Sequence, residues 1–379
     1  MQVSRHPASL DPRDRFESLV DVLRGRAEAQ AHAELFSILR DDGEVAETLS
    51  YRALDRRACA IAAALRQRFQ PGERALLLFP VGVDFIAAFF GCLYAGLVAV
   101  PAYPPRLRRG NPQLSAIIGD CSPATVLTNA ANLERFRATV DPLVSGRELA
   151  WIAVDQVDEP AADPWRGPAL DPNTLAFVQY TSGSTSTPKG VMVSHANLID
   201  NERAIYNAFG MSSDAVVVGW LPLYHDMGLI GNVLQPLFAG ARCVLMSPAA
   251  FLQNPRRWLE AISRFRGTTS GGPNFAYEHC VRAIAPEQRL GLDLSSWRVA
   301  FNGAEPVHAA TLERFAAAFA GCGFRREAFL PCYGLAEATL FVTGGALDSA
   351  VSPVEFSNGE LERHHAAVPA VDADRRGLL

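Results

Sequence analysis

Lysine is nearly absent from this sequence. Of the 35 lysine and arginine residues in the 379-residue chain, only Lys189 is a lysine. A mechanism that needs a second lysine amine therefore has no candidate in this chain. An ammonium is a compact point charge, whereas the guanidinium of arginine is planar and spreads its charge. The loop around Lys189 is thus the first candidate for a functional site.

A basic surplus and paired cysteines are also lacking. The formal net charge is −5, without the basic stripe typical of nucleic-acid-binding proteins, so no nucleic-acid partner is expected. The seven cysteines include no CxxC pair, which indicates reduced thiols in a cytoplasmic protein rather than a disulfide frame or zinc site. The polar N-terminal segment does not resemble a signal peptide. His364 and His365 are interpreted as exposed tail rather than metal ligands.

One uncharged run, residues 85–105, is long enough to cross a bilayer. The residues around it favour another reading. "ALLLF" (75–79) and "VAVPAY" (98–103) are typical of buried strands, while Asp84 is expected to cap a helix and Gly96 to end it. We therefore expect a buried strand–helix–strand unit and no membrane span.

Strands and helices alternate along most of the chain. Helices are expected over 15–30, 51–69 and 132–140 and from about Ser194, with a hairpin turn at Asp42-Gly43. Strands are expected in 125–129, 149–155, 175–184, 215–222, 242–248, 267–273 and 297–306, and the Pro-rich segment 158–172 joins two halves. This order predicts an α/β protein with a largely parallel sheet, whose ligands lie beyond the carboxyl ends of the strands. After about residue 347 the alternation stops.

The loop "YTSGSTSTPKG" (180–190) combines glycines, hydroxyl groups and the single lysine. Its amides and hydroxyls can donate hydrogen bonds to phosphate oxygens, and Lys189 adds a positive charge. The loop is not the GxxxxGK[ST] loop of common NTPases, because Pro188 stands at the position of the second glycine and Gly190 follows the lysine. The simpler alternative is a Ser/Thr-rich surface turn.

This loop resembles the phosphate loop of the adenylate-forming enzymes, which include acyl-CoA synthetases, luciferases and peptide-synthetase adenylation domains. "LPLYHDMGLIG" (221–231), "NGAEP" (302–306) and "YGLAEAT" (333–339) resemble further motifs of that family in the same order. Together with "GGPNFAYEHC" (271–280), they resemble most the fatty acyl-AMP ligases, and Ala336 fits that branch. The resemblance covers essentially the whole chain. It implies two packed, mostly parallel β-sheet subdomains flanked by helices, with a smaller β-rich part.

The resemblance also implies roles for individual residues. It assigns catalytic roles to Lys189, His225 and Glu337, with Glu337 as the Mg²⁺ ligand. It places the ATP phosphates and adenine against Thr181, Ser182, Gly183, Ser184, Thr185, Gly303, Ala304, Glu305, Tyr333 and Gly334. It places the carboxylate beside His225 and the alkyl chain against Met227, Phe275 and Tyr277.

The chemistry agrees with these roles. When a carboxylate attacks ATP and expels pyrophosphate, charge builds on phosphate oxygens, so positioned donors, a cation and a metal ligand are needed. ATP and Mg²⁺ are the expected cofactors. Structural readings stay open: His225 paired with Asp226, Tyr333 as core packing, and Glu337 as a charge at a helix N-terminus.

The resemblance further predicts how the chain is organised. Residues 1–379 are expected to be the N-terminal AMP-binding domain, with subdomains of about 1–170 and 171–350. Residues 351–379 are expected to begin a ligase-specific insertion, which implies a fatty acid substrate and an acyl carrier protein as acceptor. The family's C-terminal lid, with its lysine, is expected to be absent, so this chain would bind its ligands but turn over poorly.

Two alternatives remain. The first is an acyl-CoA synthetase or an adenylating enzyme for another carboxylic acid. The second, from another class, is a nucleotide-binding module without catalysis.

Overall fold

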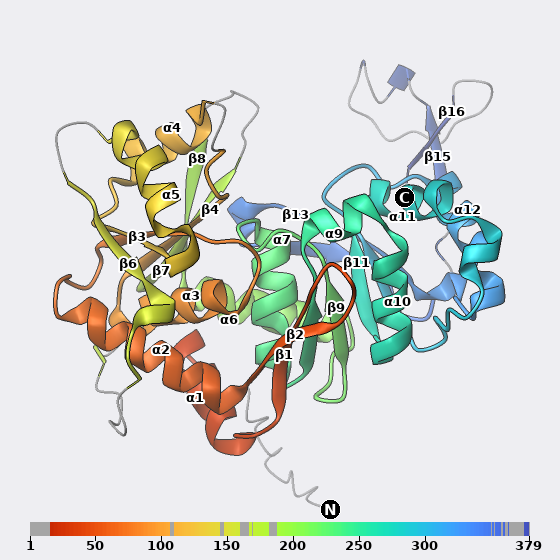
Figure 1. Ribbon diagram of the computed structural model, residues 1–379. Coiled ribbons are helices and arrows are strands. Elements are labelled where there is room, and N and C mark those ends of the chain that lie inside the picture. Colours follow the sequence, from red (N-terminus) through yellow and green to blue (C-terminus); the bar gives the residue numbers. More distant parts are fainter. Residues whose placement is uncertain are drawn as a thin grey trace, which may run out of the picture.

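Two large β-sheets with helices around them make up the computed structural model (Figure 1). The structure describes residues 16–106, 110–144, 148–159, 167–168, 170–181, 188–349, 351, 353–357, 359–360, 363 and 375–378. Within these residues, one sheet has six strands, the other has eight, and β15 (Val354–Ser357) pairs with β16 (Arg375–Leu378). The predicted α/β fold with two largely parallel sheets is confirmed.

The six-stranded sheet has the order β6-β5-β3-β4-β7-β8. Its strands are β3 (Arg74–Leu78), β4 (Val98–Ala102), β5 (Thr125–Thr128), β6 (Ala150–Ala153), β7 (Leu175–Thr181) and β8 (Lys189–Ser194). The first five strands of that order pair in parallel, and β8 pairs antiparallel with β7 at the edge. Strand β8 was not predicted, because the sequence suggested that a helix follows the loop.

The eight-stranded sheet has the order β14-β13-β12-β11-β9-β10-β1-β2. Its strands are β1 (Glu34–Leu39), β2 (Val45–Ser50), β9 (Val216–Gly219), β10 (Arg242–Leu245), β11 (Thr269–Gly272), β12 (Val299–Asn302), β13 (Phe329–Gly334) and β14 (Phe341–Gly344). The hairpin predicted at Asp42-Gly43 joins β1 to β2. Strands β1 and β2 therefore lie in the sheet of the second half, and β7 and β8 in the sheet of the first, so sheet membership does not divide the sequence at residue 170.

Helices cover both sheets. The α-helices are α1 (Leu19–Ala29), α2 (Tyr51–Arg66), α3 (Val83–Ala95), α4 (Pro112–Cys121), α5 (Ala130–Val140), α6 (His195–Ala208), α7 (Asp226–Leu229), α8 (Gln235–Ala239), α9 (Pro248–Gln253), α10 (Arg256–Phe265), α11 (Asn274–Ala283) and α12 (Ala309–Phe319). The π-helix η4 (Ile230–Leu234) joins α7 to α8. Shorter 3₁₀ turns are η2 (Asp141–Leu143), η3 (Val154–Gln156), η5 (Pro286–Arg289), η6 (Ala320–Cys322), η7 (Arg326–Ala328) and η8 (Ala336–Ala338). In Figure 1, α6 and α7 lie between the region of β3 to β7 and the region of β11 to β13.

The uncharged run 85–105 is a buried strand–helix–strand unit, as predicted. Helix α3 is buried along nearly its whole length, and Gly96 ends it in the left-handed conformation at φ 76°. The predicted cap at Asp84 is wrong. Gly82 is the N-cap, and Asp84 lies in the first turn, where it pairs with Arg57 at 2.8 Å. Among the helices that the structure describes, none is long and apolar enough to cross a membrane.

Candidate functional site

Strands β7 and β8 hold the two ends of the Gly/Ser/Thr loop together. Thr181, the last residue of β7, pairs with Lys189, the first residue of β8. The Lys189 side chain is exposed. Ser182, Gly183, Ser184 and Thr185 lie outside the described residues. The single ammonium of the chain therefore stands at one end of the predicted phosphate loop, opposite Thr181.

His225 lies just before α7 and pairs with its neighbour. Its Nδ1 lies 2.5 Å from Oδ1 of Asp226, and the same carboxylate oxygen accepts a hydrogen bond from the Met227 backbone N–H at 2.7 Å. The hydrogen bond to Asp226 raises the pKa of His225 above its ordinary value. The paired arrangement that the sequence left open is therefore present. It orients an exposed imidazole at the edge of a cavity.

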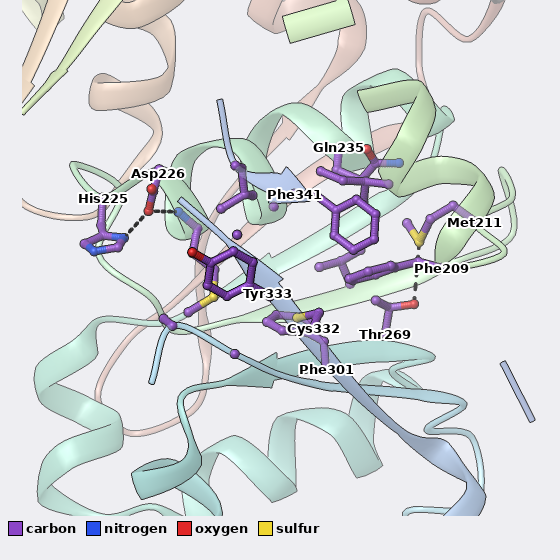
Figure 2. Close-up of a pocket in the computed structure, with 18 residues that line it drawn as sticks. Phe209, Met211, His225, Asp226, Gln235, Thr269, Phe301, Cys332, Tyr333 and Phe341 are labelled. Carbon is purple, nitrogen blue, oxygen red and sulfur yellow. Dashed lines mark hydrogen bonds and ion pairs between the residues drawn. The ribbon is translucent and has the colours of Figure 1, made fainter. Parts of the chain in front are cut away.

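A mostly apolar cavity of about 190 Å³ runs inward from His225 (Figure 2). One helical segment, α7–η4–α8, contributes Met227, Gly231 and Gln235, which are spaced four residues apart. A π-turn adds a residue to the helix, and such turns are frequent at functional sites. Asp226, the first residue of α7, also lines the cavity. The remaining lining residues lie in α6 or just after it, in the strands of the eight-stranded sheet or just after them, and in the β13–β14 hairpin: Ile205, Phe209, Met211, Val217, Thr269, Phe301, Gly303, Ala304, Cys332, Tyr333, Gly334, Leu340 and Phe341.

Tyr333 and Ala304 lie at the border of this cavity and a second one. The second cavity, of about 730 Å³, is lined by residues 304–307, the β13–β14 hairpin and the segment that follows it. The Tyr333 side chain is 59% exposed, which excludes the reading of Tyr333 as core packing. Ala304 has φ 67°, a left-handed conformation that is uncommon for a residue with a Cβ and often marks a functional site.

The segment 302–306 is held by neighbouring elements. A Cβ at Gly303 would lie 2.7 Å from the carbonyl oxygen of Cys332, so only glycine allows this close approach between the ends of β12 and β13. Glu305 accepts a hydrogen bond from the Phe275 N–H at 2.6 Å, at the N-terminus of α11. Glu305 also lines the second cavity.

A third cavity lies beside the loop ends. Its lining includes Thr181, Pro188, Tyr224, His225 and Asp226. The apolar cavity shares His225 and Asp226 with this third cavity, and shares Ala304 and Tyr333 with the second. The predicted residues Thr181, His225, Met227, Gly303, Ala304, Glu305, Tyr333 and Gly334 are thus gathered around three adjoining cavities.

Glu337 stands apart from them. It lies in the 3₁₀ turn η8, three residues after Gly334, and lines a separate hollow with Met192, Asp200 and Asn201. Its side chain is exposed, and no ion pair involves it among the described residues. These residues contain no group of three or more His, Cys, Asp and Glu side chains that could hold a metal ion by themselves.

The two aromatic residues predicted for the alkyl chain do not line the apolar cavity. Tyr277 is a fully buried core residue whose hydroxyl donates to the Phe301 carbonyl at 2.7 Å. Phe275 is 42% exposed and packs edge-on against Trp220. Phe209, Phe341 and Gln235 line the cavity but were not predicted from the sequence. In the sequence, these residues lie in apolar or helical segments like those of many core residues, so nothing marks them as part of a cavity.

Comparison with known proteins identifies the family. Residues 25–366 match the family described as AMP-binding enzyme. The medium-chain-fatty-acid–[acyl-carrier-protein] ligase JamA of Moorena producens is 48% identical over 332 residues, covering 86% of this chain and 56% of JamA. The long-chain-fatty-acid–AMP ligase FadD32 of Mycobacterium marinum is 37% identical over 343 residues, covering 89% and 54% respectively.

This chain is also similar to a solved structure. The fatty acyl-adenylate ligase from L. pneumophila, in complex with acyl adenylate and pyrophosphate, superposes with a TM-score of 0.90 at 43% identity. The match covers 97% of this chain and 64% of that one. The chain therefore spans less than two thirds of the length of these relatives. The match over residues 25–366 shows that this chain belongs to the AMP-binding enzyme family.

Proposed function

We propose that this chain provides the substrate-binding part of a fatty acyl-AMP ligase. In the proposed reaction, a carboxylate oxygen of the fatty acid attacks the α-phosphorus of ATP. The bond from that phosphorus to the bridging β-phosphate oxygen breaks, and pyrophosphate leaves with the electron pair. The product is an acyl-adenylate. The names of the relatives from M. producens and M. marinum and of the L. pneumophila structure support this proposal.

One observation carries the proposal: the apolar cavity joins the other two. Its lining is dominated by aliphatic and aromatic side chains, and it reaches from His225 to Gln235 (Figure 2). An alkyl chain would gain free energy from burial there, about 0.8 kcal/mol for each methylene. The carboxylate of the fatty acid would lie near His225. This position is between the third cavity, which the ends of the phosphate loop line, and the second cavity, which Tyr333 lines.

The nucleotide would occupy the two flanking cavities. Tyr333 would stack on adenine, with Gly303, Ala304, Glu305 and Gly334 around its edge. The loop between Thr181 and Lys189 would hold the β- and γ-phosphates, and the Lys189 ammonium would neutralise their charge. A His225 imidazole that carries a proton, favoured by its contact with Asp226, would attract the carboxylate.

In this proposal Mg²⁺ binds the carboxylate of Glu337, which lines a hollow apart from the three cavities. The ion is usually held by one or two carboxylates together with phosphates and waters, rather than by a cage of protein ligands. Glu337, exposed and without an ion pair among the described residues, supplies one such oxygen ligand. When bound, the metal would neutralise charge on the phosphate oxygens.

The acceptor and the rest of the protein belong to the same proposal. We propose an acyl carrier protein as acceptor, as the name of JamA suggests for that relative. The longer relatives support residues 1–379 as an N-terminal domain that acts with a C-terminal lid, and residues 351–379 as the start of an insertion. None of the seven cysteines, all of which lie in the described part of the chain, forms a disulfide, which supports a cytoplasmic location.

An amino acid is a less suitable substrate for the same cavity. The one carboxylate that lines the cavity belongs to Asp226, and it is engaged by His225 and the Met227 N–H. It is therefore not free to pair with an α-amine.

Calorimetry on this chain tests the proposal with unreactive acyl-sulfamate adenosines, which mimic the acyl-adenylate. Gly231 lines the cavity, and a Cβ added there meets no atom within 4 Å. Gly231→Leu should therefore fill the cavity without disturbing its wall. We expect the wild type to bind a long-tailed mimic far more tightly than AMP, and Gly231→Leu to lose the gain from the tail while keeping its affinity for AMP.

Gly119→Leu is the matched control. A Cβ at Gly119 also meets no atom within 4 Å, and Gly119 lies in α4 and does not line the apolar cavity. It should behave like the wild type. If the tail adds no affinity in the wild type, the fatty-acyl assignment is wrong.

A further inference from the structure

The far end of the apolar cavity contains an unexpected polar side chain. Figure 2 shows His225 and Asp226 at one side of the cavity, and Met211, Thr269 and Gln235 at the opposite side. The Gln235 side chain is 2% exposed, so it is buried in a wall built mostly of Phe209, Phe341 and other apolar groups. A buried amide in such a wall costs free energy unless its donors and acceptor are paired.

Gln235 is paired with a residue outside the cavity. With its amide oriented to satisfy its hydrogen bonds, the nitrogen donates to the backbone carbonyl of Glu202 at 3.1 Å and to Oε2 of the Glu202 carboxyl group. Gln235 begins α8, and Glu202 lies on α6, one turn before Ile205, which lines the cavity. Helices α6 and α8 pack against each other. The Gln235 amide nitrogen is therefore held by two acceptors of one residue, the backbone carbonyl and the carboxyl group of Glu202.

Glu202 is itself an unusual residue for this position. It is 0% exposed, and no cation pairs with it among the described residues. Burial raises the pKa of this carboxyl group well above its ordinary value, because the charged form loses its hydration. Burial therefore favours the neutral carboxylic acid over the carboxylate. Its Oε1 has no hydrogen-bond partner among the described residues.

Burying both polar side chains costs free energy, which suggests that the fixed position of Gln235 has a function. A leucine pair would pack α6 against α8 without burying polar groups. The hydrogen bonds from Gln235 to Glu202 instead fix the direction of a flexible side chain that an apolar contact would leave free to change rotamer. Gln235 also ends the row Met227, Gly231, Gln235 along the cavity wall, at the side opposite His225.

We propose that Gln235, held in place by Glu202, blocks the far end of the cavity and sets the longest acyl chain that the site admits. This rests on the proposed function, since it assumes that the cavity takes an alkyl chain. Gln235 is then a specificity-determining residue, because it contacts the end of the chain. Glu202 is a positioning residue that acts through Gln235.

The test is calorimetric binding of acyl-sulfamate adenosines whose tails grow by one methylene at a time. In the wild type we expect affinity to rise by up to about fourfold with each methylene and then to stop rising at a defined length. Gln235→Ala should move this limit to longer tails, and Gln235→Asn, which is one methylene shorter and keeps the amide, should move it less.

Two changes at Glu202 test its positioning role. Glu202→Gln keeps a polar side chain of the same size and should leave the limit unchanged. Glu202→Ala opens space behind Gln235, so that the amide can withdraw from the cavity and the limit should lengthen. Asn232→Ala is the matched control, because Asn232 is a buried amide on the same helical segment that does not line the cavity. It should not change the limit.

The outcomes separate this inference from the proposed function. Flat affinity across all tails in the wild type would contradict the proposed function. A clear limit in the wild type that stays unchanged in Gln235→Ala and Glu202→Ala would overturn the inference alone. Thermal unfolding and binding of the shortest mimic establish that each variant is folded, and Gln235→Asn decides the question if Gln235→Ala does not fold.

Discussion

Single residues of this chain carry charges that the site can use or must suppress. Lys189 is exposed at the start of β8, and it is the only lysine of the sequence. Glu202 is buried without a counter-charge among the described residues, and His225 is paired with Asp226. These environments can be tested through the labelling rate of Lys189 and the pKa values of Glu202 and His225.

Lys189 can be followed by chemical labelling. Because the chain has one lysine, an amine-reactive reagent can modify only Lys189 and the terminal α-amine. If the ammonium binds the phosphates of ATP, saturating ATP should slow modification of Lys189 several-fold and leave the α-amine rate unchanged as an internal control. Mass spectrometry of the peptide that contains Lys189 measures both forms. Equal rates with and without ATP would place the phosphates elsewhere.

Glu202→Gln should stabilise the protein at neutral pH. Below the pKa of about 4.3 that a glutamate has in an unfolded chain, both the folded and the unfolded states hold the proton. As the pH rises above this value, the unfolded chain releases the proton while the folded chain keeps it, because burial raises the folded pKa. The wild type then loses about 1.4 kcal/mol of unfolding free energy per pH unit until the folded pKa is reached, and the variant does not.

Urea unfolding at several pH values measures this difference. The advantage of Glu202→Gln should be small near pH 4.5 and should grow toward pH 7. An advantage that does not change with pH would show that Glu202 is ionised in the folded protein.

Asp226→Asn should lower the pKa of His225. The hydrogen bond from the imidazole to the Asp226 carboxylate is the largest cause of its raised pKa, and an amide keeps the geometry without the charge. NMR titration of the His225 ring protons, assigned with a His225→Gln variant, measures the change. An unchanged midpoint would show that the carboxylate does not stabilise the protonated imidazole.

At the scale of elements, the junction of α1 and α6 responds to acid. His195 begins α6, is 1% exposed, and its Nδ1 accepts a hydrogen bond from the Leu19 N–H at the start of α1 at 3.4 Å. Burial lowers the pKa of His195 to about 4. In the unfolded chain a histidine has a pKa of about 6.5, so the stability due to neutral His195 is present above pH 6.5 and is lost as the pH falls toward 4.

His195→Asn should therefore make the protein less sensitive to acid. The asparagine Oδ1 can accept the same hydrogen bond, but the side chain takes up no proton. Between pH 6.5 and 4 the wild type should lose roughly 3 kcal/mol more unfolding free energy than the variant. His32→Asn, at an exposed position, is the control and should lose as much as the wild type. Equal acid sensitivity of all three proteins would contradict the expectation.

Helices α1, α2, α3, α5 and α6 and most strands were predicted from the sequence, whereas helices α4 and α7 to α12 and strands β13 and β14 were not located. Helix α2 buries Leu54, Ala58 and Ile61 on the face that its spacing indicates, and Ser194 begins α6 as an N-cap. Strand β8 was missed because its side chains are mostly exposed at its start and do not alternate between buried and exposed positions. The π-turn η4 was missed because one extra residue per turn leaves no trace in a short apolar segment.

The motifs predicted which residues lie close together, and the roles of those residues stay predictions. His225, Met227, Ala304 and Tyr333 lie around adjoining cavities. Tyr277 lies in the core instead, because an aromatic residue in a motif can equally serve the core. Phe209 and Phe341 are brought to the cavity by packing of α6 against β14, which no local pattern records.

In the whole molecule, each large sheet contains two strands from the other half of the sequence. Strands β1 and β2 complete the sheet of the second half, and β7 and β8 complete the sheet of the first. A fragment beginning at residue 171 would therefore lack two strands of its own sheet and carry two strands of the other. We expect such a fragment to lack the near-ultraviolet circular dichroism of a packed core, whereas the 379-residue chain should unfold cooperatively. A fragment that folds and unfolds cooperatively would contradict this expectation.

The site lies where the two sheets approach each other. Helices α6 and α7 stand between the two sheet regions (Figure 1). The apolar cavity adjoins the third cavity at His225 and the second cavity at Tyr333. In the proposed function, the alkyl chain and the charged nucleotide would bind in adjoining but chemically different spaces.

A crystal structure of this chain with a long-tailed acyl-sulfamate adenosine tests the central claim most directly. We expect electron density for the alkyl tail in the apolar cavity, from His225 toward Gln235, with the adenine ring against Tyr333 and Ala304. An alkyl tail found in the cavity beside Val307 and Val351, or an adenine ring away from Tyr333, would contradict it.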